Sequence, residues 1–176
     1  MEIQAKSKFD FDTMKAFTHF SLFGKANPKK RFITWSTISV ILTVIVILEM
    51  ILFSDPSLIV MLCVSVGLFL LECYLYFLLP KIQYKSLRKL QGAENEYIFC
   101  DHVLKAITKS EEYSGEAAIE YSMFAKVYES SRYLFLYQTN RQVHIIDKNT
   151  IEGGTAEDIR NKLTPYVKDK YFLCKS

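Results

Sequence analysis

The sequence predicts a membrane protein of the α+β class, in which a hairpin of two transmembrane helices is followed by a small antiparallel β domain and a C-terminal helix. Three observations predict it. Two apolar runs of 22 residues each, 32–53 and 58–79, are separated by only four residues. Basic residues gather beside both runs, and from residue 91 onward the apolar residues alternate, as they do in strands. A chain of 176 residues accommodates the hairpin and one small domain.

Both apolar runs are long enough to cross a membrane. At 1.5 Å per residue, a helix of this length reaches about 33 Å, and a hydrocarbon core is about 30 Å thick. The first run contains no Lys, Arg or Asn, and Glu72 is the only charged residue of the second. The connection 54–57 is so short that the second helix must return antiparallel to the first. The polar and charged residues before the first run argue against a cleaved signal peptide.

Basic residues form two collars at the ends of the runs that face away from the short connection. Residues 1–31 hold seven basic residues against three acidic ones, and residues 80–90 hold four against none. Lys and Arg beside short apolar segments stay in the cytoplasm. We therefore expect a cell-membrane protein with both chain ends in the cytoplasm and Asp55 on the outer side. The collars also suit contact with anionic lipid heads. Their residues are Lys29, Lys30, Arg31, Lys81, Lys85, Arg88 and Lys89.

Few polar side chains lie inside the predicted hairpin. Ser39 and Thr43 share a face of the first helix, and Ser65 and Glu72 share a face of the second. Glu72 lies at the depth of Ser39, and a carboxyl facing lipid would cost several kcal/mol, so we expect Glu72 to face the first helix. Its role stays open between holding the hairpin together, relaying a proton or ion, and contacting another membrane subunit.

Residues 1–31 are predicted to be a cytosolic segment with an amphipathic helix from Thr13 to Phe23, capped by Asp12. Its apolar face would lie either in the headgroup layer or against the cytosolic domain, and the sequence leaves both open. The hairpin then occupies 32–79, the second collar 80–90, and the β domain 91–176.

Within 91–176, alternating apolar residues predict five or six short antiparallel strands. In the most aromatic strand, 133–137, the Tyr and Phe side chains are expected on one face and the two Leu side chains on the other. A helix is predicted after Thr155, with Asp158 completing a capping box and Ile159 and Leu163 facing inward.

No catalytic, cofactor or metal site is predicted. His19, His102 and His144 lie in different segments without a nucleophile at a familiar spacing, and the cysteines show no zinc-binding spacing. The segment 153–155, Gly-Gly-Thr, lacks the Lys of a phosphate-binding loop and is typical of a loop and helix cap. Residues 91–176 carry more acidic than basic residues, which disfavours nucleic acid as a partner.

The order of these parts, together with Ile119-Glu120-Tyr121-Ser122-Met123-Phe124-Ala125-Lys126-Val127-Tyr128-Glu129 and Ile145-Ile146-Asp147-Lys148, resembles the YcxB-like family of small bacterial membrane proteins. The resemblance implies a C-terminal domain similar to a pleckstrin-homology-type fold, and it brings no catalytic residues. The chain departs from the family pattern at Asp147-Lys148, where a Pro-Lys pair is expected, which leaves the shape of that turn open.

Two functions remain. In the first, the β domain is an interaction module held at the inner face of the membrane, where it binds a protein partner or, as second choice, lipid headgroups. In the second, the hairpin oligomerises or joins a transporter as an accessory subunit, with Glu72 as the responsive polar group. The expected partners are therefore the bilayer and a protein or a second copy of the chain, with neither nucleic acid nor a small-molecule substrate, and no enzymatic activity is expected.

Overall fold

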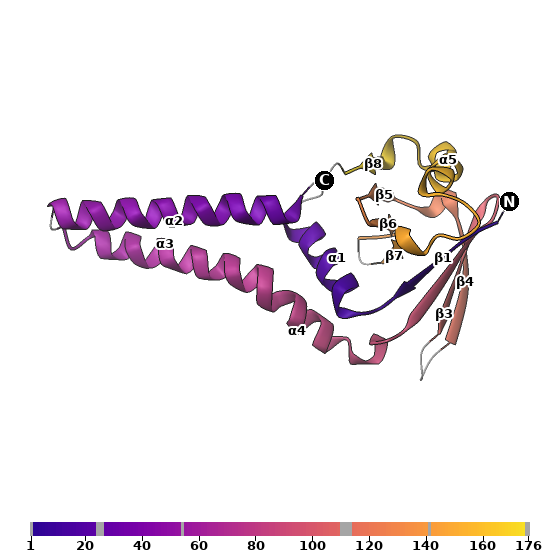
Figure 1. Ribbon diagram of the computed structural model, residues 1–176, viewed down its shortest axis with the longest axis horizontal. Coiled ribbons are helices and arrows are strands. Elements are labelled where there is room, and N and C mark those ends of the chain that lie inside the picture. Colours follow the sequence, from indigo (N-terminus) through magenta and orange to yellow (C-terminus); the bar gives the residue numbers. More distant parts are fainter. Residues whose placement is uncertain (1, 24–26, 54, 110–113, 141, 175–176) are drawn as a thin grey trace.

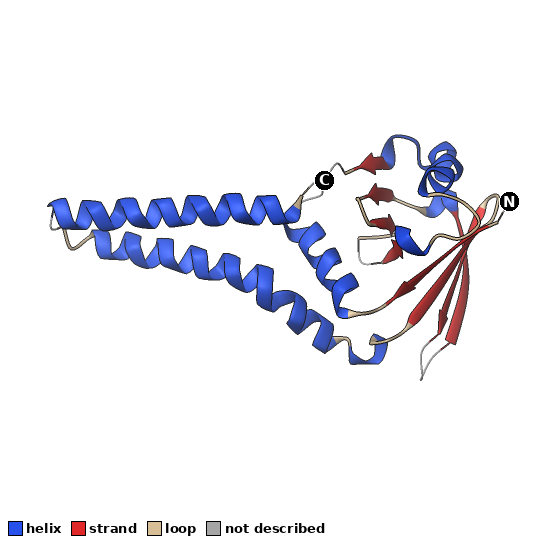
Figure 2. Cartoon of the chain, in the orientation of Figure 1, coloured by secondary structure: helices blue, strands red, loops and turns tan. Residues whose placement is uncertain are grey.

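The computed structural model describes residues 2–23, 27–53, 55–109, 114–140 and 142–174. A pair of long antiparallel helices projects from a domain made of two β-sheets and a C-terminal helix (Figures 1 and 2). This arrangement confirms the coarse architecture that the sequence predicts. Ser54, in the predicted connection of the hairpin, lies outside the described residues.

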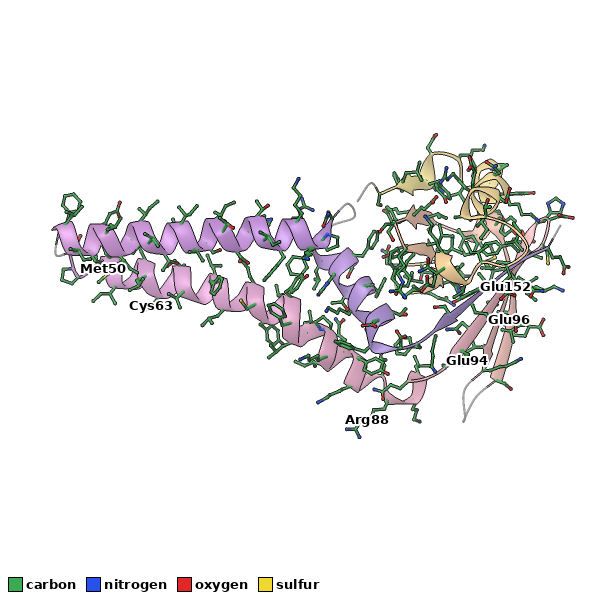
Figure 3. All side chains as sticks on the ribbon, viewed as in Figure 1. Met50, Cys63, Arg88, Glu94, Glu96 and Glu152 are labelled. Atoms are coloured by element: carbon green, nitrogen blue, oxygen red, sulfur yellow. The ribbon has the colours of Figure 1, made fainter. Side chains whose placement is uncertain are left out.

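The hairpin consists of α2 (Pro28–Phe53) and a second helix that runs unbroken over Leu58–Ser86. The second helix comprises α3 (Leu58–Cys73), a π-helical segment (Tyr74–Leu78) and α4 (Leu79–Ser86). Both are long and apolar enough to span a membrane. Apolar side chains cover them along their length, with Met50 and Cys63 near the far end (Figure 3). Most of these side chains are exposed and very few are buried, whereas the core helix of a soluble protein would bury one face.

Each helix extends beyond its predicted run on the side of the β domain. Pro28 occupies the first position of α2, where its missing N–H costs nothing, and the Asn27 side chain caps the helix by accepting from the Lys30 N–H at 3.0 Å. Pro80 lies within the second helix and does not end it, so the second collar begins on helix α4.

Two four-stranded sheets form the β domain. The first has the order β1 (Ile3–Lys8), β2 (Glu94–Phe99), β3 (Val103–Lys109) and β4 (Ser114–Glu120), with all neighbours antiparallel. The second has the order β7 (Val143–Asp147), β6 (Tyr133–Tyr137), β5 (Lys126–Glu129) and β8 (Tyr171–Leu173). Here β8 runs parallel to β5, which corrects the expectation of antiparallel strands alone.

Strand β1 was not predicted, because residues 1–31 were assigned to a segment separate from the β domain. It pairs with β2 over its whole length, from Ile3 opposite Phe99 to Lys8 opposite Glu94. Ile3, Ala5 and Ser7 are buried while Lys6 and Lys8 are exposed. The hairpin is therefore inserted between two neighbouring strands of one sheet.

The second sheet is buried on both faces. One face joins a core with the first sheet and with α5 (Ala156–Val167), which contributes Ile159, Leu163 and Val167. Leu134 and Leu136 lie in this core, whereas Tyr133 and Phe135 belong to a second cluster on the opposite face. The predicted alternation along 133–137 is thus confirmed, and both faces are apolar because both are covered.

Helix α1 (Phe11–Phe23) covers the second face of that sheet. Phe20 is 4% exposed and stacks on Phe135 with ring centroids 4.3 Å apart. Of the two placements that the sequence left open, the helix packs on the domain. Its cap is Asp10, which accepts from the Thr13 N–H at 2.8 Å, and the predicted cap Asp12 lies within the first turn.

The capping box of α5 is confirmed. Thr155 Oγ1 accepts from the Asp158 N–H at 3.2 Å, and Asp158 Oδ2 accepts from the Thr155 N–H at 2.8 Å. Gly154 packs so closely on β1 that an added Cβ would lie 2.9 Å from the Ile3 side chain. The Gly-Gly segment therefore serves close packing, as expected for a loop and cap.

Candidate functional site at the base of the hairpin

Aromatic rings join the base of the hairpin to α1. The ring of Tyr76, in the π-helical segment, stacks between Phe32 of α2 and His19 of α1, with centroids 4.0 and 4.1 Å away. Phe23 meets Tyr76 edge-on at 5.4 Å. Because each such pair contributes about 0.5–1.5 kcal/mol beyond its buried area, the cluster fixes α1 against both long helices.

The hydrogen bond from His19 to this segment lies one turn before Pro80. In an α-helix the Tyr76 carbonyl would accept a hydrogen bond from the N–H of residue 80, which a proline lacks. The carbonyl instead accepts from His19 Nε2 at 2.8 Å, so His19 carries its proton on that nitrogen. Burial lowers the pKa of His19; the bond to Tyr76 opposes this shift and the charge of Lys15 adds to it.

A second set of contacts ties α1 and the residues before it to α4, about two helical turns beyond Tyr76. Thr18 Oγ1 donates to Gln83 Oε1 at 2.7 Å, and the ring of Tyr84 lies 5.9 Å from Phe11 and 6.1 Å from Phe9. Since α1 also packs on the second sheet, the β domain is held to the hairpin by side-chain contacts as well as by its two chain connections.

A cavity of about 260 Å³ lies between α1, the start of α2 and the turn that joins β5 to β6. Its apolar lining comes from Ala16, His19, Phe20, Pro28, Tyr76, Tyr133 and Phe135, and its polar lining from Asn27, Lys29, Ser130, Ser131 and Arg132. None of these lining residues is acidic. The cavity thus combines an aromatic wall with two cationic side chains.

Arg132 is held in place at this cavity. Its Nε and Nη2 atoms donate to Asp147 Oδ2 at 3.1 and 2.9 Å, and its guanidinium carbon lies 5.0 Å from the centre of the Tyr133 ring. Asp147 Oδ1 also accepts from the Asn149 N–H at 3.0 Å, which shapes the turn after β7. The residue at which the chain departs from the family pattern therefore positions an arginine.

The polar residues inside the hairpin meet in part as predicted. Ser39 Oγ donates to Glu72 Oε1 at 2.8 Å, so Glu72 faces the first helix. Thr43 bonds back to the Ser39 carbonyl at 2.9 Å, and Ser65 to the Leu62 carbonyl at 3.0 Å, so neither reaches Glu72. Glu72 Oε2 and Ser36 Oγ are buried and have no hydrogen-bond partner among the described residues.

The collar residues lie at one end of the hairpin and are all exposed. Lys29, Lys30 and Arg31 occupy the first turn of α2, Lys81 and Lys85 lie on α4, and Arg88 and Lys89 lie in the 3-10 turn that follows. Figure 3 shows Arg88 beyond the base of the hairpin, on the side of the β domain. Lys29 is the collar residue that also lines the cavity.

Sequence reasoning missed a buried ionic cluster around Glu129, which is 5% exposed. Its carboxylate accepts from Arg160 of α5, from Lys148 at 3.0 Å and from the Tyr171 hydroxyl at 2.7 Å. Burial alone would raise the pKa of Glu129, but the hydrogen bonds from Arg160, Tyr171 and Lys148 outweigh it and hold the pKa below its ordinary value. Because these donors occupy the carboxylate, the cluster is structural.

The histidines do not converge. His102 pairs with Tyr166 at an exposed turn, and His144 packs between Tyr97 and Phe124, on the face of β7 opposite Val143 and Ile145. Burial lowers the pKa of His144. Within the part of the chain that the structure describes, no group of three or more His, Cys, Asp or Glu side chains could hold a metal ion.

The fold and the site define a class of protein: a two-sheet β domain fixed to a hairpin of long apolar helices with a basic base. Residues 105–163 match the family model of the YcxB-like proteins, from within β3 to within α5. The resemblance to this family is confirmed over those residues. Comparisons with curated proteins and with solved structures gave no match.

Proposed function

We propose that this protein is a membrane-anchored interaction module, whose β domain binds a protein partner at the cytosolic face of the cell membrane. Two helices with exposed apolar surfaces support the insertion, since a surface of this kind in water would favour aggregation. Both collars lie at the domain end, which supports a cytosolic domain. Two sheets closed by a C-terminal helix support a pleckstrin-homology-type arrangement.

The observation that carries this proposal is the open edge of β4. Among the described residues, Ser114–Glu120 pairs with β3 on one side only, and although it carries Glu116 and Glu120, it contains neither Lys nor Pro, which protect such edges most often. At the opposite edge, β1 is covered by backbone bonds between Gln4 and Glu152 at 2.8 and 2.9 Å. In Figure 1, β4 lies at the end of the molecule away from the α2–α3 connection, where an extended partner segment could add a strand.

Purification of the full-length protein from its native membrane in mild detergent tests the proposal. A partner held at fixed stoichiometry should be lost when Glu116 and Glu120 on β4 are both changed to Lys, because cationic side chains at an edge oppose strand addition. Glu157→Lys, on the exposed surface of α5, is the control. A partner that survives the double change does not use this edge, and the absence of any partner would contradict the proposal.

Membrane topology is tested separately by cysteine labelling of intact cells. A cysteine at position 55 should react with an impermeant maleimide, whereas one at position 85 should react only after the cells are opened. Protection at position 55 together with labelling at position 85 would show the opposite orientation.

A second candidate function is an oligomerising or transporter-accessory hairpin, favoured by the unpartnered oxygens of Glu72 and Ser36. A polar group without a partner between two apolar helices is expected to attract a donor from a third helix. Glu72→Gln keeps an acceptor for Ser39 but replaces the carboxyl group with an amide. Cross-linking in membranes that loses dimers on this change, with normal insertion, would support the second candidate; unchanged association would count against it.

A further inference from the structure

We propose that the cavity at the base of the hairpin binds a phosphate-bearing anion, which in the membrane is the headgroup of an anionic phospholipid. The lipid source rests on the proposed membrane insertion, whereas the affinity for phosphate rests on the cavity itself. The cavity lies beside the first turn of α2, the level at which a membrane-inserted hairpin would meet the headgroups.

Charge complementarity selects an anion. Lys29 and Arg132 approach the cavity from different elements, and no lining residue is acidic. Asp147 and the nearby Asp10 offset part of the charge of Arg132, but Asp147 bonds only Nε and Nη2, so this pair leaves the Nη1 donors for a ligand. The pair also holds the guanidinium in one position, which lowers the entropy that binding would cost.

Neutral donors suit phosphate oxygens. Ser131 and Asn27 line the same cavity, and because Asn27 Oδ1 accepts from the Lys30 N–H, the amide nitrogen of Asn27 remains as a donor. The N–H of Lys29 is among the four that a helix cannot satisfy internally, and the positive end of the α2 dipole adds to its attraction for anions. Charged, hydroxyl and amide donors thus surround one space.

The aromatic wall limits what else fits. His19, Phe20 and Tyr76 give the cavity an apolar side that would suit the glycerol part of a lipid rather than a fully hydrated ion. At about 30 Å³ for a water molecule in the liquid, a space of about 260 Å³ has room for a phosphate with a small polyol.

The test measures lipid retained by the full-length protein in detergent, by native mass spectrometry, after addition of dioleoyl phosphatidylglycerol or dioleoyl phosphatidylcholine. The unchanged protein should retain phosphatidylglycerol at least about tenfold more strongly, and Lys29→Gln with Arg132→Gln should remove that preference. Lys85→Gln with Lys89→Gln removes the same charge from the second collar and should preserve it. Lys29→Gln alone, at an exposed residue, should weaken retention without affecting the fold.

Competition with inorganic phosphate and glycerol phosphate separates the two sources. If millimolar glycerol phosphate displaces the lipid, the cavity binds a soluble phosphate ester. If the lipid stays bound, its headgroup is the ligand. If both double variants lose phosphatidylglycerol to the same extent, the lipid is attracted by the collars in general and the proposal is overturned. The proposal is also overturned if both double variants retain the lipid as strongly as the unchanged protein. Labelling at position 55 reports insertion independently, so failure of the cavity and failure of the membrane anchor are distinguishable.

Discussion

Arg160 and Glu129 form a two-point ion pair that joins α5 to β5: Arg160 Nε lies 3.0 Å from Oε2 and Nη2 lies 3.0 Å from Oε1. Lys148 and Tyr171 bond the same carboxylate, so the turn after β7 and the strand β8 meet α5 at one side chain. The Glu129 carboxylate thus joins the turn after β7 and strand β8 to helix α5.

Glu129→Gln should destabilise the β domain by about 3 kcal/mol, because it removes the charge of a buried carboxylate and leaves the half-buried Arg160 and Lys148 without their counter-charge. Thermal unfolding in detergent, followed by the near-ultraviolet circular dichroism of buried tyrosines, measures the change. Asp101→Asn removes the ion pair between Asp101 and Lys162, which are 3.6 Å apart. Because the Asp101 side chain is 82% exposed, this change should have little effect on stability. Equal effects of the two changes would show that the cluster does not hold the fold.

Tyr76→Ala should loosen α1 from the hairpin, since it removes the ring that stacks on both Phe32 and His19. A large aromatic truncation at a packed site costs about 3–5 kcal/mol. Hydrogen exchange along Phe11–Phe23 should accelerate, while exchange in the first sheet stays unchanged. Tyr76→Phe keeps the ring and serves as the control; acceleration in this variant too would contradict a role for stacking.

Asp10→Ala should cost about 1 kcal/mol, because Asp10 accepts from the Thr13 N–H at the start of α1. Asp12→Ala should change little, since Asp12 lies in the first turn and does not cap the helix. The difference in unfolding temperature between the two variants distinguishes the observed cap from the one that the sequence predicts.

The β domain should lose stability as the pH falls from about 7.5 to about 5.5. Burial holds the pKa of His144 and His19 below 6.5, so the unfolded chain takes up protons before the folded one does. Stability from these groups is complete above the unfolded pKa and declines below it. His144→Gln should reduce the dependence of the unfolding temperature on pH. An unchanged slope in His144→Gln would exclude this histidine as the cause.

Local patterns in the sequence predicted the parts of the fold that they control. The apolar runs predicted where the two long helices end next to their short connection, at Phe53 and Leu58. Counting residues inward along each run predicted that Glu72 lies opposite Ser39. Period-two alternation gave the two faces of β6, and Thr155 with Asp158 gave the start of α5. Each of these features depends on residues close together in the chain.

Features that depend on distant segments were missed. Strand β1 has a mixed polar sequence, and its partner β2 lies beyond the whole hairpin. Strand β8 has only three residues and pairs in parallel. The Glu129 cluster and the cavity at the base of the hairpin are each formed by side chains from several elements, and no residue spacing in the sequence predicts either. Arg141 lies outside the described residues.

The insertion of the hairpin between β1 and β2 makes the order of synthesis matter. Strand β1 leaves the ribosome before β2, so it has no pairing partner until both long helices have been synthesised. The first sheet can form only if the chain after the hairpin returns to the side of the membrane on which β1 lies. A hairpin threaded with its two ends on opposite sides of a membrane would leave β2 with an open edge and Ile3 exposed, so completion of the sheet acts as a check on correct threading.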